Sequence, residues 1–153
     1  MSRFLFVYGT LRRDQGNPFA AHLERWGAWL GAARLRGRLY ALAHYPGVVA
    51  CPMASGSVQG EVYRLPPRDQ LLRFLDRYEG PEFQRRQAPV RLAAGAIVRA
   101  WYYAYTGPVT AAQRIPEGDY LQWVRQTGRA SDWPLMMTYA APGKGTTPPP
   151  FFG

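Results

Sequence analysis

The chain has 153 residues, a length that suits one domain and is short for two. Hydrophobic residues make up 47% of it, an ordinary globular value, and a single cysteine, Cys51, excludes an intrachain disulfide. The sequence contains no apolar stretch of about 20 residues, the length that a membrane-spanning helix needs. The apolar run Phe4–Val7 is also too short for a secretion signal. We therefore expect a cytoplasmic protein with no membrane partner.

The formal net charge is +9, from 19 basic and 10 acidic residues. Nearly all the basic residues are arginines, and they are scattered: the densest groups are Arg12-Arg13, Arg34/Arg36/Arg38 and Arg85-Arg86. A nucleic-acid site usually gathers its charge on one face or along one helix. The scattered pattern instead favours a solvated basic surface, which would also attract anionic substrates. Nucleic acid is therefore disfavoured as a partner.

Apolar periodicity in the first half of the chain predicts mostly strands. Leu35, Leu39 and Ala41 alternate with arginines, which is typical of a strand with one buried face. The elements predicted here are a buried strand over 4–8 that ends at a glycine turn, a helix over 19–30, a half-buried strand over 34–42, a turn over 45–47, and strands over 48–50 and 58–65.

The second half contains the clearest predicted helix, over Arg68–Glu79. Pro67 suits the start of a helix, leucines at helical spacing form a core-facing stripe, and Gly80-Pro81 ends it. After it the pattern predicts strands over 87–92 and 97–105 and a helix over 116–126. We assign residues 1–130 to one domain and residues 131–153 to a Pro/Gly-rich C-terminal extension.

Strands that follow one another through short turns favour antiparallel pairing. The predicted fold is therefore α+β, with a small, mostly antiparallel, barrel-like sheet and two or three flanking helices.

Several standard catalytic devices are missing from the sequence. It has no glycine-rich nucleotide loop and no G-x-S-x-G nucleophile elbow. His22 and His44 lack metal-ligand spacing, and Cys51 has no neighbouring base that would activate its thiol. The sequence therefore offers no pattern for a nucleotide loop, a metal site or an activated cysteine.

The segment Tyr8-Gly9-Thr10-Leu11 follows the first predicted strand. A glycine there lets the backbone bend sharply and lets a ligand approach closely. Successive backbone N–H groups in such a turn can bind an anion or a developing oxyanion. On spacing alone, an ordinary turn at the end of a strand explains the segment equally well.

Glu79 is the second candidate residue. It falls in the last turn of the predicted helix, where the helix dipole disfavours a negative charge, and Asp76 lies three residues earlier on the same face. Both effects would raise its pKa, which suits a general acid/base. Pairing with Arg77, Arg85 or Arg86 would lower the pKa again, and that alternative stays open.

Three short blocks resemble the γ-glutamylcyclotransferase superfamily, in particular its AIG2-like and γ-glutamylamine cyclotransferase branch. They are residues 6–12 (Phe-Val-Tyr-Gly-Thr-Leu-Arg), 60–63 (Gly-Glu-Val-Tyr) and 75–80 (Leu-Asp-Arg-Tyr-Glu-Gly). Tyr45-Pro46-Gly47 matches a further recurrent segment, so the resemblance covers about residues 4–105. It implies a small β-barrel with helices packed around it.

The resemblance also implies a reaction. The α-amine of a γ-glutamyl amine or peptide attacks the side-chain carbonyl of the same molecule, giving 5-oxoproline and a free amine without a cofactor. Tyr8, Gly9, Thr10 and Leu11 would bind the γ-glutamyl group through backbone amides, and Glu79 would be the general acid/base. Relatives often have tyrosine where this chain has Phe83, so a packing role is expected there. The alternative function is a non-catalytic small-molecule binding or interaction module on the same fold.

Overall fold

The computed structural model describes residues 3–9, 12, 18–42, 45–51, 53–67, 72–73, 75–76 and 81–127. The proposed extension over 131–153 lies outside these ranges, so its assignment stays a prediction. Within the described ranges, none of the helices has the length and apolar character needed to cross a membrane.

The described residues form seven strands and three short helices. The strands are β1 (Phe4–Val7), β2 (Ala28–Ala41), β3 (Pro46–Ala50), β4 (Ser57–Arg64), β5 (Phe83–Leu92), β6 (Ile97–Tyr105) and β7 (Arg114–Ile115). The helices are α1 (Pro18–Trp26), the 3₁₀ turn η1 (Ala111–Gln113) and α3 (Tyr120–Thr127). Leu72, Arg73, Leu75 and Asp76, in the predicted central helix, are also helical.

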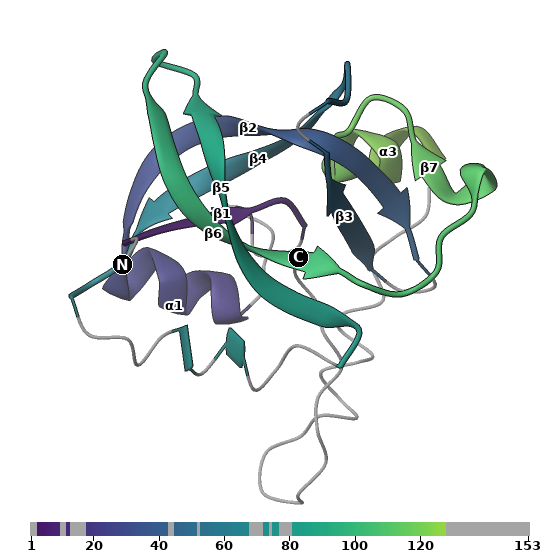
Figure 1. Ribbon diagram of the computed structural model, residues 1–153. Helices are drawn as coiled ribbons and strands as arrows, with labels where there is room; N and C mark the ends of the chain where they lie inside the picture. The colour runs from purple at the N-terminus through teal and green to yellow at the C-terminus, as the bar shows by residue number, and fades with distance from the viewer. Residues whose placement is uncertain are drawn as a thin grey trace, which may run out of the picture.

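The strands close into a barrel (Figure 1). They run in the order β1-β4-β2-β3-β6-β5, with β7 on β2, and β1 closes the sheet by pairing with β6. The pairing of β1 with β4 is antiparallel and its pairing with β6 is parallel. The predicted α+β fold with a barrel-like sheet is therefore confirmed.

The long strand β2 shows the predicted alternation. Leu35 and Leu39 are buried, whereas the arginines between them are exposed. The strand begins at Ala28, however, inside the region predicted as helix. Helix α1 ends at Trp26 and is followed by Gly27, where an added Cβ would lie 3.0 Å from the carbonyl oxygens of Leu23 and Arg64.

Other boundaries differ from the predictions for physical reasons. Pro46 and Gly47, expected in a turn, belong to β3, where Pro46 is the first residue of the strand and pairs with Ala41. Strands β5 and β6 form an antiparallel hairpin. Strand β5 starts earlier than predicted, at Phe83, because the pairing extends to Phe83 and Tyr105 at the open end of the hairpin. Helix α3 starts only at Tyr120, since Gly118 has a positive φ of 68° that interrupts helical geometry.

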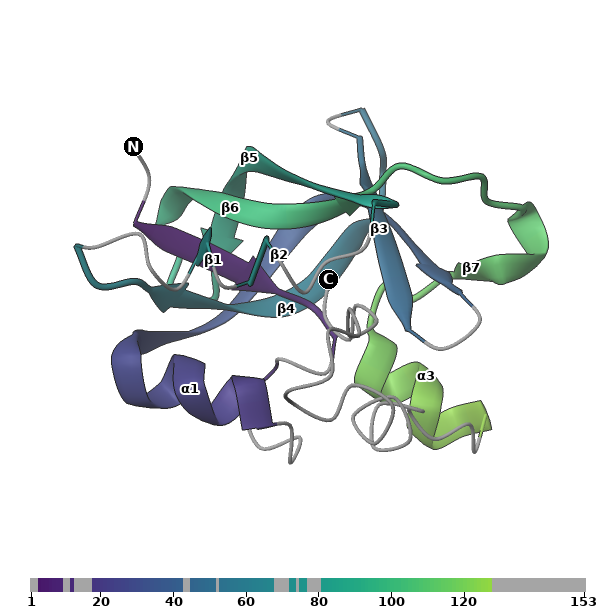
Figure 2. The same cartoon turned by 90° about the horizontal axis from the view of Figure 1, so that it is seen from below.

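The core has two layers. Phe6, Tyr8, Val62 and other inward-facing side chains fill the barrel, whereas Leu5, Val7 and Tyr63 point outward and pack with Leu23 of α1. Figure 2 shows α1 lying against the β1–β4 side of the sheet. Strand β4, predicted over 58–65, is buried on both faces along most of its length, because side chains of α1 pack against its outer side.

Gly60 lies where β4 passes β1, and a methyl group there would overlap the carbonyl oxygen of Val7 and the ring of Phe6. We expect Gly60→Ala to destabilise the protein by about 1–3 kcal/mol, since overpacking a closed core displaces backbone. Thermal unfolding of this variant should be compared with that of Gly56→Ala, whose new methyl would meet only the Arg114 side chain at 3.9 Å. Equal melting temperatures for the two variants would contradict this packing.

Candidate active site

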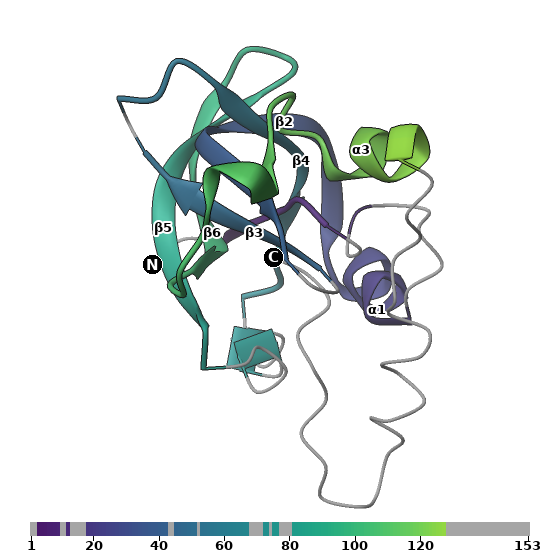
Figure 3. The ribbon, with the colours of Figure 1, turned by 90° about the vertical axis from the view of Figure 1, so that its right-hand side faces the viewer.

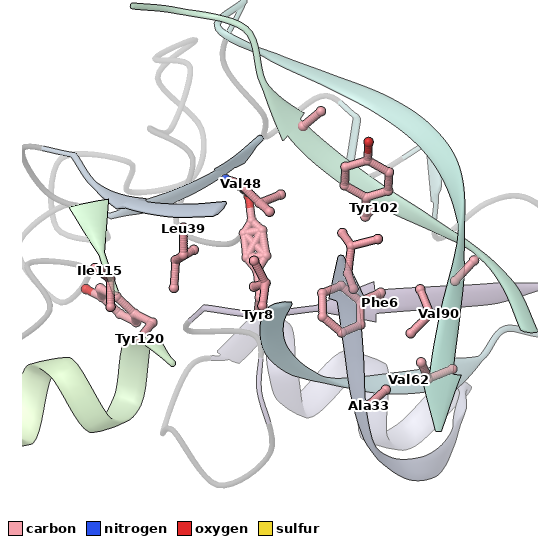
Figure 4. Close-up of a cluster of buried hydrophobic side chains, with 14 residues drawn as sticks. Phe6, Tyr8, Ala33, Leu39, Val48, Val62, Val90, Tyr102, Ile115 and Tyr120 are labelled. Atoms are coloured by element: carbon pink, nitrogen blue, oxygen red, sulfur yellow. Dashed lines mark hydrogen bonds between the residues drawn. The ribbon is translucent and has the colours of Figure 1, made fainter. Parts of the chain in front are cut away.

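Tyr8 anchors the start of the predicted substrate loop. Its ring points into the barrel (Figure 4), and the residue is fully buried. The hydroxyl donates to the carbonyl of Tyr103 at 2.8 Å and accepts from the backbone N–H of Val48 at 3.2 Å. Because these bonds tie β1 to β6 and β3, the side chain of Tyr8 fixes the backbone from which the loop leaves the barrel.

The turn predicted after β1 is present at its two described ends. Gly9 is buried, and its carbonyl accepts a hydrogen bond from the backbone N–H of Arg12 at 3.1 Å. Such a bond across four residues is typical of a β-turn. Thr10 and Leu11, at the centre of the predicted binding segment, lie outside the described residues, so their role stays a prediction.

Arg12 holds the far end of this turn. Its Nε lies 3.1 Å from Oε2 of Glu61 on β4, and its Nη1 lies 3.0 Å from Oδ1 of Asp119 before α3. Glu61 is 8% exposed, and its other carboxylate oxygen accepts a hydrogen bond from Trp29 Nε1 at 3.1 Å. The turn is therefore clamped between β4 and the start of α3 by partly buried, hydrogen-bonded charges.

This clamp was not predicted as part of the site. The sequence did contain a signal for Glu61. An acidic residue within an apolar strand needs a polar or charged partner if both faces of that strand are buried. Asp119 also accepts a hydrogen bond from the N–H of Gln122, which is typical of a residue that caps a helix. Neither pattern alone points to Arg12, because the pairing depends on how the strands close.

The helical residues before Glu79 pack on the outside of the barrel. Leu72 and Leu75 are buried, as the predicted stripe requires, and Asp76 is exposed to solvent. Glu79 itself lies outside the described residues. Its position relative to Gly9, on which the predicted mechanism depends, stays a prediction.

Asp76, which was expected to repel a negative charge on Glu79, makes two contacts of its own. Its Oδ1 accepts from the hydroxyl of Tyr103 at 2.7 Å and from Nε of Arg85 at 2.9 Å. The charge of Asp76 is therefore offset by Arg85, which weakens the like-charge repulsion expected to act on Glu79. The same ion pair engages Arg85, one of the three arginines considered as partners of Glu79.

A cavity of about 560 Å³ lies beside this ion pair. Asp76, Arg85 and Tyr103 supply polar groups to its wall, and Trp101 supplies a ring that stacks under the Arg85 guanidinium at 4.2 Å. The volume is within the range of small-molecule sites. Tyr103 links the cavity to the barrel interior, because its carbonyl binds Tyr8 and its hydroxyl binds Asp76.

Phe83 also contributes to the wall of this cavity. Its ring is 7% exposed and packs between Tyr45 and Tyr105, with centroid distances of 5.7 and 5.4 Å. These contacts agree with the packing role expected for this residue.

Tyr102 is buried in the barrel. Burial raises the pKa of the Tyr102 phenol above its ordinary value of 10.0, although Arg86 partly opposes this. Within the described ranges, no cluster of three His, Cys, Asp or Glu side chains has the arrangement needed to hold a metal ion.

The barrel thus combines a glycine turn fixed at both described ends with a cavity at its outer wall that is lined by charged and aromatic side chains. A family model described as gamma-glutamyl cyclotransferase, AIG2-like, matches residues 5–122. The chain therefore belongs to the AIG2-like γ-glutamylcyclotransferase family, and the predicted membership is confirmed.

The chain is also similar to individual named proteins. The chain is 37% identical over 126 residues to the gamma-glutamylcyclotransferase family protein YtfP of Escherichia coli K12, covering 76% of this chain and 95% of the relative. It is 36% identical over 95 residues to gamma-glutamylaminecyclotransferase of Rattus norvegicus, covering 55% of this chain and 60% of the relative.

Solved structures have the same fold. The solution structure of E. coli YtfP matches with a TM-score of 0.57 at 36% identity, covering 78% of this chain and 97% of that one. An AIG2-like protein from Mus musculus matches with a TM-score of 0.61 at 28% identity, covering 77% and 87%.

Tyr8→Phe should destabilise the protein by about 1–3 kcal/mol, because it leaves the buried Val48 N–H and the Tyr103 carbonyl without their shared partner. Denaturant unfolding measures the loss. Tyr102→Phe removes a hydroxyl that makes no hydrogen bond among the described residues, and a similar loss there would contradict the anchoring role.

Arg12→Gln should cost about 3 kcal/mol, because it leaves the Glu61 carboxylate buried without its cation. Glu61→Gln should recover part of this loss when it is combined with Arg12→Gln. A double-mutant cycle of unfolding free energies tests the coupling. Additive losses would show that the two side chains act independently.

Proposed function

We propose that this protein converts a γ-glutamyl amine or γ-glutamyl peptide into 5-oxoproline and a free amine. Family membership supports this reaction, as does the similarity to proteins named gamma-glutamylaminecyclotransferase from rat and cattle. The structural observation that carries the proposal is the doubly fixed turn: Tyr8 anchors it inside the barrel, and Arg12 clamps it to β4 and α3.

In the proposed reaction the α-amine nitrogen of the substrate forms a bond to its own γ-carbonyl carbon. Glu79 takes a proton from that amine as the bond forms, and the carbonyl oxygen becomes an oxyanion. Backbone N–H groups of the Tyr8–Leu11 segment stabilise this oxyanion. The bond to the leaving nitrogen then breaks, and Glu79 returns the proton to that nitrogen. Atoms and charges balance without water, metal or cofactor.

The main task of the protein in this scheme is to hold the substrate in a folded conformation. Nucleophile and electrophile are in one molecule, so restricting its rotations supplies much of the acceleration. A turn fixed at both ends suits that task, because its N–H groups need no reorganisation as the oxyanion develops. The cavity beside Asp76, Arg85 and Tyr103 provides charged and aromatic groups that suit the remainder of the substrate.

Release of 5-oxoproline from a panel of γ-glutamyl amines and dipeptides tests the proposal. Glu79→Gln should lower kcat by about 10²–10⁴-fold with little change in KM, since the side chain keeps its shape and loses its base. Glu82→Gln is the matched control: it makes the same chemical change three positions later, at an exposed residue, and should retain activity.

Two outcomes would contradict the assignment. Equal rates for wild type and Glu79→Gln would remove Glu79 from the chemistry. No release of 5-oxoproline from any member of the panel, by a protein that unfolds cooperatively, would favour the non-catalytic binding module.

A further inference from the structure

An exposed apolar surface lies where α1 is followed by β2. Five large apolar side chains are exposed in the described ranges, and three of them are Trp26, Trp29 and Leu30. A single exposed apolar residue is common on protein surfaces, whereas a group of them often marks a site of contact. Trp29, which is 42% exposed, also donates a hydrogen bond to the clamp of the candidate site.

The indole of Trp29 is held toward the strand that carries the turn. The backbone of Trp29 pairs with Tyr63 on β4, but its Nε1 lies 3.1 Å from Oε1 of Glu61, two residues earlier on β4. Glu61 in turn pairs with Val7 on β1, two residues before Gly9. The ring therefore runs along the outer side of β4 in the direction in which β1 reaches the turn.

The backbone of β2 is irregular just after Trp29. Its register with β4 shifts between Trp29 and Gly31, and Gly31 has a positive φ of 120°, a conformation that favours glycine. Bulges of this kind interrupt the ladder and redirect side chains. Leu30 is left outside the pairing and is exposed. The strand thus presents two consecutive apolar residues to solvent beside the clamp.

The turn after β1 has different surroundings on its two sides. Strand β1 lies between β4 and β6, and in Figures 2 and 3 it ends between α1 and α3. On the β6 side, the cavity lined by Asp76, Arg85 and Tyr103 offers charged and polar groups. On the β4 side, the ring of Trp29 offers an apolar face. A substrate held at the turn can place a polar end on one side and an apolar end on the other.

We propose that Trp29 binds the leaving group of the substrate, and that the preferred substrates are γ-glutamyl derivatives of arylalkyl amines. This inference rests on the proposed cyclotransferase reaction. The α-amine and α-carboxylate of the γ-glutamyl group are polar and suit the charged side, so the amine substituent is the part that meets the indole. Aromatic rings pack favourably against one another, and an indole already fixed by Glu61 loses little freedom when it binds.

Two substrates that differ only by a phenyl ring test the preference: γ-glutamyl propylamide and γ-glutamyl 3-phenylpropylamide, whose amines have similar basicity. In the wild type, kcat/KM for release of 5-oxoproline should be about tenfold higher for the phenylpropylamide, because its ring is partly desolvated against Trp29. Release from both amides at equal kcat/KM would overturn the inference and leave the proposed reaction in place.

Substitutions of Trp29 separate its ring from its hydrogen bond. Trp29→Phe keeps an aromatic ring but loses the N–H that binds Glu61, whereas Trp29→Ala loses both. The ratio of the two kcat/KM values cancels any general loss of activity. It should stay within about twofold of wild type in Trp29→Phe and fall below about threefold in Trp29→Ala. An unchanged ratio in Trp29→Ala, or an equal fall in both variants, would overturn the role of the ring.

Trp26→Ala is the matched control. Trp26 is an exposed tryptophan three positions away, and the Arg25 guanidinium lies 5.5 Å from the centre of its ring. Its loss should change the ratio by less than about twofold if the contact is local to Trp29. A fall as large as that of Trp29→Ala would show a diffuse effect of apolar surface and would overturn the assignment to Trp29.

Binding gives a readout that does not depend on turnover. Calorimetric titration of Glu79→Gln should give a Kd about tenfold lower for the phenylpropylamide than for the propylamide. This difference should persist if no variant releases 5-oxoproline, in which case the proposed reaction fails and the aromatic preference stands. Equal Kd values, or no binding of either amide, would overturn the inference.

Discussion

One buried hydroxyl group connects several strands of the barrel. The phenol of Tyr8 bonds to the Val48 N–H on β3 and to the Tyr103 carbonyl on β6, next to the point where those strands are paired through Val48 and Ala104. Because β3 and β6 share only a short stretch of backbone pairing at this parallel contact, the phenol reinforces the closure of the barrel from inside. The same two bonds fix the last residue before the glycine turn. Barrel closure and the position of the candidate site therefore depend on one side chain.

Ion pairs hold the charged groups around the candidate site. Arg12 contacts Glu61 and Asp119, and Arg85 contacts Asp76, so each of these two arginines has a carboxylate partner from another part of the chain. Removing one member of such a partly buried pair leaves the other charge without its counter-charge. This arrangement suits groups that must keep a fixed position.

Structural features that depend on local sequence pattern were predicted well. Features that depend on closure of the barrel were predicted less well. The alternation in β2 and the extent of β6 followed from periodicity, and the family followed from three short blocks. The end of α1 was missed because Gly27 is constrained by Arg64 on another strand, not by its neighbours in the chain. The Arg12–Glu61–Asp119 clamp was missed because its members are far apart in sequence. The contact of Asp76 with Arg85 from β5 was not predicted either, and the raised pKa expected for Glu79 stays a prediction.

The position of β1 has a consequence for how the chain is made. This strand is synthesised before both of its neighbours in the barrel, β4 and β6, so one of its edges has no partner until residues near 100 have been translated. Its side chains Leu5, Phe6 and Val7 are all buried in the finished fold, and they cannot complete that packing before then. Final closure is a long-range event that local contacts cannot start, which favours slow folding.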